Sequence, residues 1–150
     1  MKRILCVCSG GGHLTEMLII AAAMPHHHKT LVTFSGRHNA VGAGFARHYI
    51  MPHFTKNPMH LPFAPLRAAW IMLRERPDVL LSTGAEIAIP FFLLGKLAGV
   101  RTVYVECSAQ VRAPSRTGQL LCRVADLFFV QWKPLLEYYG GRARYAGGLL

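Results

Sequence analysis

Short apolar segments of strand length alternate along this chain with segments of helical periodicity. The apolar segments are ILCVC (4–8), TLVTF (30–34), DVLLST (78–83), TVYVEC (102–107) and DLFFVQ (126–131), with a weaker one at HYIMPHF (48–54). The helical segments lie at 14–23, 65–76, 87–98, 117–124 and 134–139. Strands that are apolar on both faces and separated by helices indicate a parallel sheet with helices on both faces. The sequence therefore predicts one α/β domain over residues 1–150.

The charge of the chain is basic and unevenly placed. Its 17 Lys and Arg residues against 7 Asp and Glu give a formal charge of +10, while 52% hydrophobic residues are enough for a core. No acidic residue occurs between Glu16 and Glu75, and that stretch holds the cations Lys29, Arg37, Arg47, Lys56, Arg67 and Arg74. Such a field favours anionic partners, namely nucleic acid, an anionic membrane surface or a phosphorylated substrate.

The four cysteines, Cys6, Cys8, Cys107 and Cys122, show no C-x-x-C spacing. They therefore predict buried thiols in a reducing cytoplasm, not a zinc ribbon or a disulfide framework. The run His26–His28 predicts an exposed turn, with metal binding as the alternative. The start MKRILCVC is basic, but its apolar run is too short for a signal peptide, and IAIPFFLLG (87–95) falls short of the ~20 residues that a membrane-spanning helix needs.

Polar and glycine-rich residues follow three of the predicted strands. They are SGGGH (9–13), STGAE (82–86) and ECSAQ (106–110). Parallel strands present their carboxyl ends at one edge of a sheet, where α/β proteins bind ligands. Each segment alone also fits a tight turn that needs glycine, but together they predict a site. Glycines 10–12 would leave backbone N–H groups at a helix N-terminus open to an anion.

Two nucleotide-binding fingerprints are absent from the sequence. In a dinucleotide motif, Thr15 would stand where the third glycine is needed, and TLVTFSGRH (30–38) offers no acidic residue for a ribose. The pair Gly95-Lys96 follows a helix and precedes Leu97, which does not fit a P-loop. The sequence therefore predicts neither NAD nor ATP as a ligand, and no cofactor.

Three longer stretches together resemble a glycosyltransferase family. They are SGGGHLTEML (9–18), the segment from RPDVLLSTGAE to VYVECSAQV (76–111) and SRTGQLLCRVADLFFVQW (115–132). They resemble the membrane-associated subunit of the two-component N-acetylglucosaminyltransferase of dolichol-linked oligosaccharide synthesis. PssD-type subunits of bacterial exopolysaccharide transferases are similar too, and the N-terminal half of MurG is a more distant likeness. Residues 25–60 match poorly.

The resemblance implies a Rossmann-like sheet equivalent to the N-terminal, acceptor-binding half of a GT-B glycosyltransferase. A separate donor-binding subunit would then supply the UDP-sugar site as a heterodimer, and the chain would be inactive alone. The acceptor would be a sugar on a polyprenyl diphosphate, in exopolysaccharide or other lipid-linked glycan synthesis at the cytoplasmic face of the membrane. Nucleic acid is not an expected partner. The PssD-type likeness favours glucuronic acid or another hexose as the transferred sugar.

The resemblance also suggests roles for residues of the candidate site. His13 is the first candidate for the general base, and Glu106 is the second or orients the acceptor; His13 ordering the loop is the alternative. The acceptor and its phosphates are expected to contact Ser9, Gly10, Gly11, Gly12, Thr83, Gly84 and Arg112. Arg112 also fits an exposed, solvated position. Glu16 and Glu86 are expected to stabilise helix N-termini.

The segment 53–76 contains the predicted membrane-docking residues, Phe63, Arg67, Trp70 and Arg74. A proline-rich apolar loop that includes Met59 and Leu61, with Lys56 on its basic rim, suits an anionic leaflet. For residues 66–73 the expectation is different. A helix from Pro65 places Leu66, Ala69, Trp70 and Leu73 on one face, which is expected to pack on the sheet.

Two other functions remain open on the residues alone. A pI near 10.0 allows a nucleic-acid-binding module, although the cations are scattered and form no known motif. A self-sufficient small α/β enzyme is the other, although G-x-S-x-G is absent. The tail RARYAGGLL (142–150) is expected either to contact a partner or to form a last strand or cap.

Overall fold

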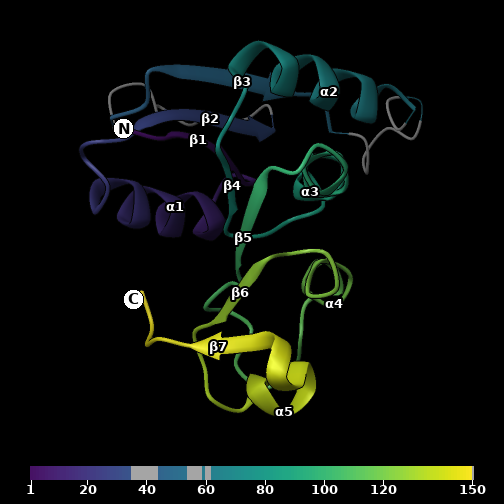
Figure 1. Cartoon of the computed structure of the whole chain (residues 1–150). Coiled ribbons are helices and arrows are strands. Elements are labelled where there is room, and N and C mark those ends of the chain that lie inside the picture. The colour runs from purple at the N-terminus through teal and green to yellow at the C-terminus, as the bar shows by residue number, and fades with distance from the viewer. Residues whose placement is uncertain (35–43, 54–58, 60–61, 150) are drawn as a thin grey trace.

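The computed structural model describes residues 1–34, 44–53, 59 and 62–149, and it confirms a parallel sheet with helices on both faces (Figure 1). The strands are β1 (Arg3–Val7), β2 (His28–Phe34), β3 (Arg47–Met51), β4 (Val79–Ser82), β5 (Arg101–Val105), β6 (Leu127–Val130) and β7 (Ala143–Tyr145). The helices are α1 (Gly12–Ala22), α2 (Phe63–Glu75), α3 (Ala88–Leu97), α4 (Arg116–Leu121) and α5 (Leu135–Tyr139), and a 3₁₀ turn, η2, follows at Gly140–Arg142.

The strand order of the sheet is β3-β2-β1-β4-β5-β6-β7, and every pairing is parallel. The chain builds outward from β1 to β3 and then returns to the other side of β1 with β4. The order therefore reverses between β1 and β4, whose pairing aligns Val7 with Ser82. Such a switch point opens a crevice at the carboxyl ends of the strands, where ligands bind in this class of sheet.

The two faces of the sheet are covered unequally among the described residues. Helices α2, α3, α4 and α5 pack on one face over a core that includes Phe91, Tyr104 and Phe128. Helix α1 packs on the other face, where Cys6, Met17 and Leu81 form a smaller core (Figure 1). Beside α1, the strands β4, β5 and β6 lack a covering helix in the described part of the chain.

Most of the predicted elements are confirmed within one or two residues. Helix α1 begins two residues earlier than predicted because Gly11 adopts φ +72°, which turns the chain directly into the helix. Strand β7 does not stand out among the apolar segments of the sequence, since three residues at the edge of the sheet carry little periodicity. It confirms the last-strand alternative for the tail. Beyond it the N–H of Leu149 donates to Oε1 of Gln131 at 2.8 Å.

The cysteines lie as predicted, mostly in the core. Cys6 and Cys8 are fully buried on the α1 face, and burial raises the pKa of both thiols to about 12. Such thiols stay protonated and chemically inert. Of the histidine run, His26 and His27 lie in a turn and His28 begins β2. None of the helices described is long and apolar enough to cross a bilayer.

Candidate functional site

The glycine loop lies between β1 and α1, at the switch point of the sheet. Gly11 is the N-cap of α1, and its carbonyl accepts the N–H groups of Leu14 and Thr15 at 3.0 and 3.1 Å. The N–H groups of Gly12 and His13 have no hydrogen-bond partner among the described residues. Because Gly11 and Gly12 are also exposed, this helix N-terminus can accept an anion.

His13 is held against the end of β4 by a reciprocal pair of hydrogen bonds. Its Nδ1 lies 2.8 Å from the carbonyl oxygen of Thr83, and the Thr83 hydroxyl donates to the His13 carbonyl at 2.6 Å. A carbonyl oxygen can only accept, so Nδ1 carries the proton of the neutral ring. The lone pair is then on Nε2, and this tautomer can accept a proton from a substrate.

Gly84 allows this contact because it has no side chain. A Cβ atom built on Gly84 would lie 2.5 Å from Cε1 and 2.6 Å from Nδ1 of His13. Its φ of +128° also lies where side-chain-bearing residues are rare. The predicted neighbours His13, Thr83 and Gly84 therefore meet in one site, brought together from the segments that follow β1 and β4.

Glu16 is a site residue that sequence reasoning missed. It was expected to stabilise a helix N-terminus, and that expectation is wrong: the first turn of α1 holds no acidic residue, and Glu16 is fully buried. Its Oε1 accepts the N–H of Ser108 at 2.8 Å and lies 3.7 Å from Sγ of Cys107. The signal was the spacing, since residues 13 and 16 lie on one side of a helix.

Cys107 completes a cluster with His13 and Glu16. A ring nitrogen of His13, a carboxylate oxygen of Glu16 and Sγ of Cys107 lie within 4.8 Å of one another. Burial raises the pKa of the Cys107 thiol, and the nearby carboxylate adds to the effect. The site thus contains the half-buried imidazole of His13, which can act as a base, next to the buried carboxylate of Glu16 and the buried thiol of Cys107.

Glu106 lies on the opposite face of the sheet from this cluster. Tyr104 and Glu106 point towards α4 and α5, whereas Val105 and Cys107 point towards α1. The Glu106 carboxylate is fully buried and accepts hydrogen bonds from the hydroxyls of Ser115 and Tyr139 and from the N–H groups of Cys107 and Ser115.

This geometry does not fit the role of a base for Glu106. Its oxygens are saturated by protein donors and have no access to solvent, so no substrate hydroxyl can reach them. Glu106 instead fixes the loop 107–115, because the Ser115 hydroxyl that it accepts also caps α4 through the N–H of Gly118 at 2.8 Å. That Glu106 orients the acceptor stays a prediction, and it would do so indirectly, by fixing this loop.

The remaining candidates are Ser9, Arg112 and Glu86. Arg112 is exposed in the loop between β5 and α4, and Ser9 is half-buried with its hydroxyl 3.4 Å from the Gly10 carbonyl. Glu86 lies at the start of α3 as expected, directly before its N-cap Ile87, and its carbonyl accepts the N–H of Ile89 at 3.1 Å. A stabilising effect of its carboxylate on this N-terminus stays a prediction. A direct contact of Arg112 with phosphate stays a prediction.

Helix α2 presents an apolar and basic surface to solvent, which we call the docking face. It consists of Phe63, Leu66, Arg67, Trp70, Leu73 and Arg74. Leu66, Trp70 and Leu73 are 68%, 51% and 76% exposed, so the expectation that this side packs on the sheet is wrong. The buried side is formed by Ala64, Ala68, Ile71 and Met72. The predicted Lys56 and Leu61 lie outside the described residues, and Met59 is exposed.

The buried end of α2 explains why the helix turns this way. The Glu75 carboxylate accepts hydrogen bonds from Thr30, Arg47 and Tyr49 at 2.9, 2.9 and 2.6 Å. Burial opposes its charge, but these three donors hold the pKa of Glu75 below its ordinary value. With Glu75 fixed against β2 and β3, Trp70 faces outward, its ring edge-on to Tyr49 and covered by the Arg74 guanidinium 5.5 Å away.

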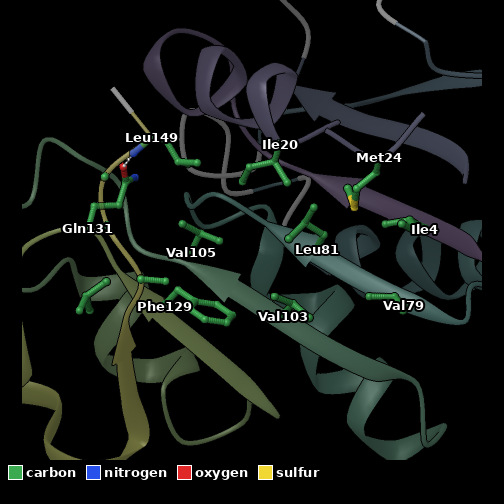
Figure 2. Close-up of a pocket in the computed structure, with 14 residues that line it drawn as sticks. Ile4, Ile20, Met24, Val79, Leu81, Val103, Val105, Phe129, Gln131 and Leu149 are labelled. Carbon is green, nitrogen blue, oxygen red and sulfur yellow. Dashed lines mark hydrogen bonds between the residues drawn. The ribbon is translucent and has the colours of Figure 1, made fainter. Parts of the chain in front are cut away.

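A groove of about 330 Å³ runs along the uncovered part of the α1 face, and we call it the sheet groove (Figure 2). Its floor is apolar and comes from β1, β4, β5 and β6, through Ile4, Leu81, Val105 and Phe129 among others. Ile20 of α1 and Met24, two residues after this helix, form one wall, and the tail 146–149 forms another (Figure 2).

Comparison with known sequences identifies a family for most of the chain. Residues 46–149 match the family "Oligosaccharide biosynthesis protein Alg14 like". The UDP-N-acetylglucosamine transferase subunit ALG14 of Homo sapiens is 26% identical over 168 residues, covering 91% of this chain and 78% of that protein. The subunit of the same name from Schizosaccharomyces pombe is 29% identical, covering 97% of this chain and 82% of that protein.

Comparison with solved structures confirms the fold. MurG of Acinetobacter baumannii superposes with a TM-score of 0.81 at 18% identity, over 99% of this chain and 45% of the MurG chain. UDP-N-acetylglucosamine 2-epimerase of Rickettsia bellii gives a TM-score of 0.76 at 10% identity, again over 99% of this chain and 45% of the other. The chain thus spans less than half of these proteins and has the fold of the N-terminal half of a GT-B glycosyltransferase. With residues 46–149 matched and relatives aligned over nearly the whole chain, this protein belongs to the Alg14-like family of oligosaccharide biosynthesis proteins.

Proposed function

We propose that this chain is the acceptor-binding subunit of a two-component glycosyltransferase. It would hold a sugar on a polyprenyl diphosphate at the membrane, while a partner subunit supplies the UDP-sugar. The observation that carries the proposal is the position of His13, which follows the open amides of the glycine loop and whose Nδ1 is held by Thr83, so that Nε2 keeps its lone pair. The relatives named as UDP-N-acetylglucosamine transferase subunits support it.

The chemistry follows from this arrangement. The N–H groups of Gly12 and His13, at the positive end of the α1 dipole, would bind the diphosphate of the acceptor. The acceptor hydroxyl would then lie near His13, whose Nε2 takes its proton as the oxygen attacks the anomeric carbon of the donor sugar. The UDP leaves from the partner's side of the cleft. Because of the relatives' names, we propose N-acetylglucosamine as the transferred sugar, in exopolysaccharide or other lipid-linked glycan synthesis.

The sheet groove is the surface that we assign to the partner subunit. It is apolar and open beside α1, and the tail that forms one wall is held by the bond from Leu149 to Gln131. An apolar segment of the donor-binding subunit would cover the strands that α1 leaves bare. The loop at Gly10 and Gly84 lies at the edge of the same sheet, so the partner would bring its donor site to the acceptor.

Ligand binding by the isolated chain tests whether this subunit binds the acceptor and the partner subunit binds the donor. We expect it to bind a polyprenyl-diphosphate-linked sugar in nanodiscs and not to bind UDP-N-acetylglucosamine, UDP-glucose or UDP-glucuronic acid. The same lipid-linked sugar on a monophosphate should bind roughly 10- to 100-fold more weakly, since it loses charge-assisted hydrogen bonds. Saturable binding of a UDP-sugar by the chain alone would contradict this assignment.

The docking face is proposed to place the subunit on an anionic leaflet at the cytoplasmic face of the membrane. We expect the chain to sediment with vesicles that contain anionic lipid, and to be released by salt, which shortens the reach of the charges to about 10 Å at 0.1 M. Changing Arg67 and Arg74 together to Gln should weaken binding by roughly fivefold for each charge.

A matched pair of apolar substitutions separates the docking face from general hydrophobicity. Phe63→Ser removes a ring that is 60% exposed on the docking face, whereas Leu120→Ser alters a side chain that is 42% exposed on α4. We expect the first to weaken vesicle binding and the second to leave it unchanged. Equal binding to neutral and anionic vesicles, or no effect of Phe63→Ser, would contradict the assignment.

A further inference from the structure

The cluster of His13, Glu16 and Cys107 contains two functional groups that the proposed transfer reaction does not use. His13 alone is needed as the base, yet Glu16 and Cys107 place a carboxylate and a thiol within 4.8 Å of its ring and of each other. Histidine and glutamate come from one side of α1, and cysteine comes from the loop after β5. Nitrogen, oxygen and sulfur donors at this spacing are the ligands that zinc takes in proteins.

The surrounding hydrogen bonds already orient two of the three side chains as metal ligands. A histidine that binds a metal usually donates its other ring N–H to a carbonyl or carboxylate, and His13 donates Nδ1–H to Thr83. A ligating carboxylate is usually hydrogen-bonded through its second oxygen, and Oε1 of Glu16 accepts the N–H of Ser108. The atoms left over are Nε2 of His13 and Oε2 of Glu16.

Oε2 of Glu16 is a second, independent observation that favours a cation at this cluster. It is buried and has no hydrogen-bond partner among the described residues, on a side chain that is 0% exposed. A carboxylate oxygen in such a place is costly unless a proton donor or a cation compensates it. The groups nearest to it are the Cys107 thiol and the His13 ring, whose Nδ1 proton is already donated to Thr83.

We propose that His13, Glu16 and Cys107 bind a divalent ion such as Zn²⁺ through Nε2, Oε2 and Sγ, and that the proton of the Cys107 thiol is released to solvent as the metal–sulfur bond forms. Mg²⁺ and Ca²⁺ are not favoured, since they prefer sites made of oxygen alone. His13 is half-exposed, so the fourth position of the ion faces the crevice and stays open to water or to a phosphate oxygen.

The ion and the transfer reaction would compete for one atom. A metal on Nε2 removes the lone pair that accepts the proton, so the ion would inhibit transfer. This consequence, unlike the metal site itself, rests on the proposed function. The site would thereby make the subunit's activity sensitive to free zinc.

Cobalt spectroscopy on the isolated full chain tests the site directly. Co²⁺ should give a saturable thiolate-to-metal charge-transfer band that Zn²⁺ displaces at one equivalent. Cys107→Ser should abolish the band, and Glu16→Gln should weaken Co²⁺ binding by at least about 10- to 100-fold. Cys122→Ser changes a half-buried cysteine outside the cluster and should leave the band intact. Circular dichroism melting would show that each variant is folded.

The outcomes separate this site from the proposed function. A band that is absent, or that survives Cys107→Ser but not Cys122→Ser, overturns the metal site. If the site binds Zn²⁺, transfer by the complete two-subunit enzyme should fall on zinc addition and recover with a chelator. Zinc binding without inhibition leaves the metal site standing and contradicts the role of His13 as base.

Discussion

Replacing His13 with alanine is expected to lower the turnover of the two-subunit enzyme by a factor on the order of 10² to 10⁴, the usual contribution of a general base. The affinity for the UDP-sugar should change little, because the donor is assigned to the partner. The measurement is steady-state transfer to a polyprenyl-diphosphate-linked sugar, with donor binding followed separately.

The structure offers a matched histidine as the control for this substitution. His26 lies exposed in the turn after α1, at the opposite end of this helix from the glycine loop, so His26→Ala should leave turnover unchanged. His13→Gln adds a second test, because glutamine can donate to the Thr83 carbonyl but provides no basic nitrogen. A loss of less than threefold for both His13 variants would remove His13 from the catalytic role.

Replacing Gly84 with alanine is expected to reduce turnover nearly as much as removing His13. The new methyl group would lie 2.5 Å from Cε1 of the His13 ring, so the ring must leave the position in which Thr83 fixes its tautomer. A displacement of this kind moves Nε2 relative to the acceptor hydroxyl, and proton transfer depends steeply on that distance. The measurements are turnover and the pH dependence of kcat.

Gly99→Ala is the control that separates the clash from backbone strain. Gly99 also has a positive φ, +69°, but a Cβ there would meet nothing within 4 Å. Both variants place a side chain at a positive φ, which is expected to lower the free energy of unfolding by about 1 to 2 kcal/mol. Only Gly84→Ala also displaces His13. Turnover of Gly84→Ala within threefold of Gly99→Ala would contradict the assigned position of the ring.

The fold could be predicted from sequence because its evidence is local and periodic. Each buried parallel strand reads as an apolar run, and each glycine segment that follows one marks the carboxyl edge of the sheet. Prediction of which segments meet, 9–13 with 82–86, then follows from the fold class. His13, Thr83 and Gly84 lie in these two segments, and the family resemblance suggested their roles.

The orientation of α2 could not be predicted because both of its sides are apolar. Ala64 and Ala68 on one side are small, and Leu66 and Leu73 on the other are large, so hydrophobicity alone favours burying the wrong side. The orientation of α2 is fixed by Glu75, whose partners Thr30, Arg47 and Tyr49 lie 26 to 45 residues away in the chain. Hydrogen bonds between residues so far apart in sequence leave no pattern in the helix sequence itself.

The positions of Glu106 and Glu16 could not be predicted for a similar reason: Glu106 was expected in the site and lies outside it, whereas Glu16 was expected only at a helix start and lies in the site. Glu106 has the expected place after β5, but its side of the strand faces α4 and α5, where Ser115 and Tyr139 saturate it. Glu16 reads as a helix-start residue, and its partner Ser108 is 92 residues away. Strand alternation would have shown that residue 107, not 106, shares a face with Cys6 and Val105, and hence with α1.

The central claim is that this chain handles the acceptor and cannot transfer a sugar without a donor-binding partner. The direct measurement is sugar transfer from a UDP-sugar to a polyprenyl-diphosphate-linked sugar by the chain alone, by its candidate partner alone and by the two together, with the mass of each species determined by light scattering. We predict transfer only by the pair, which should elute as a heterodimer. Robust transfer by the isolated chain as a monomer would contradict the two-component account.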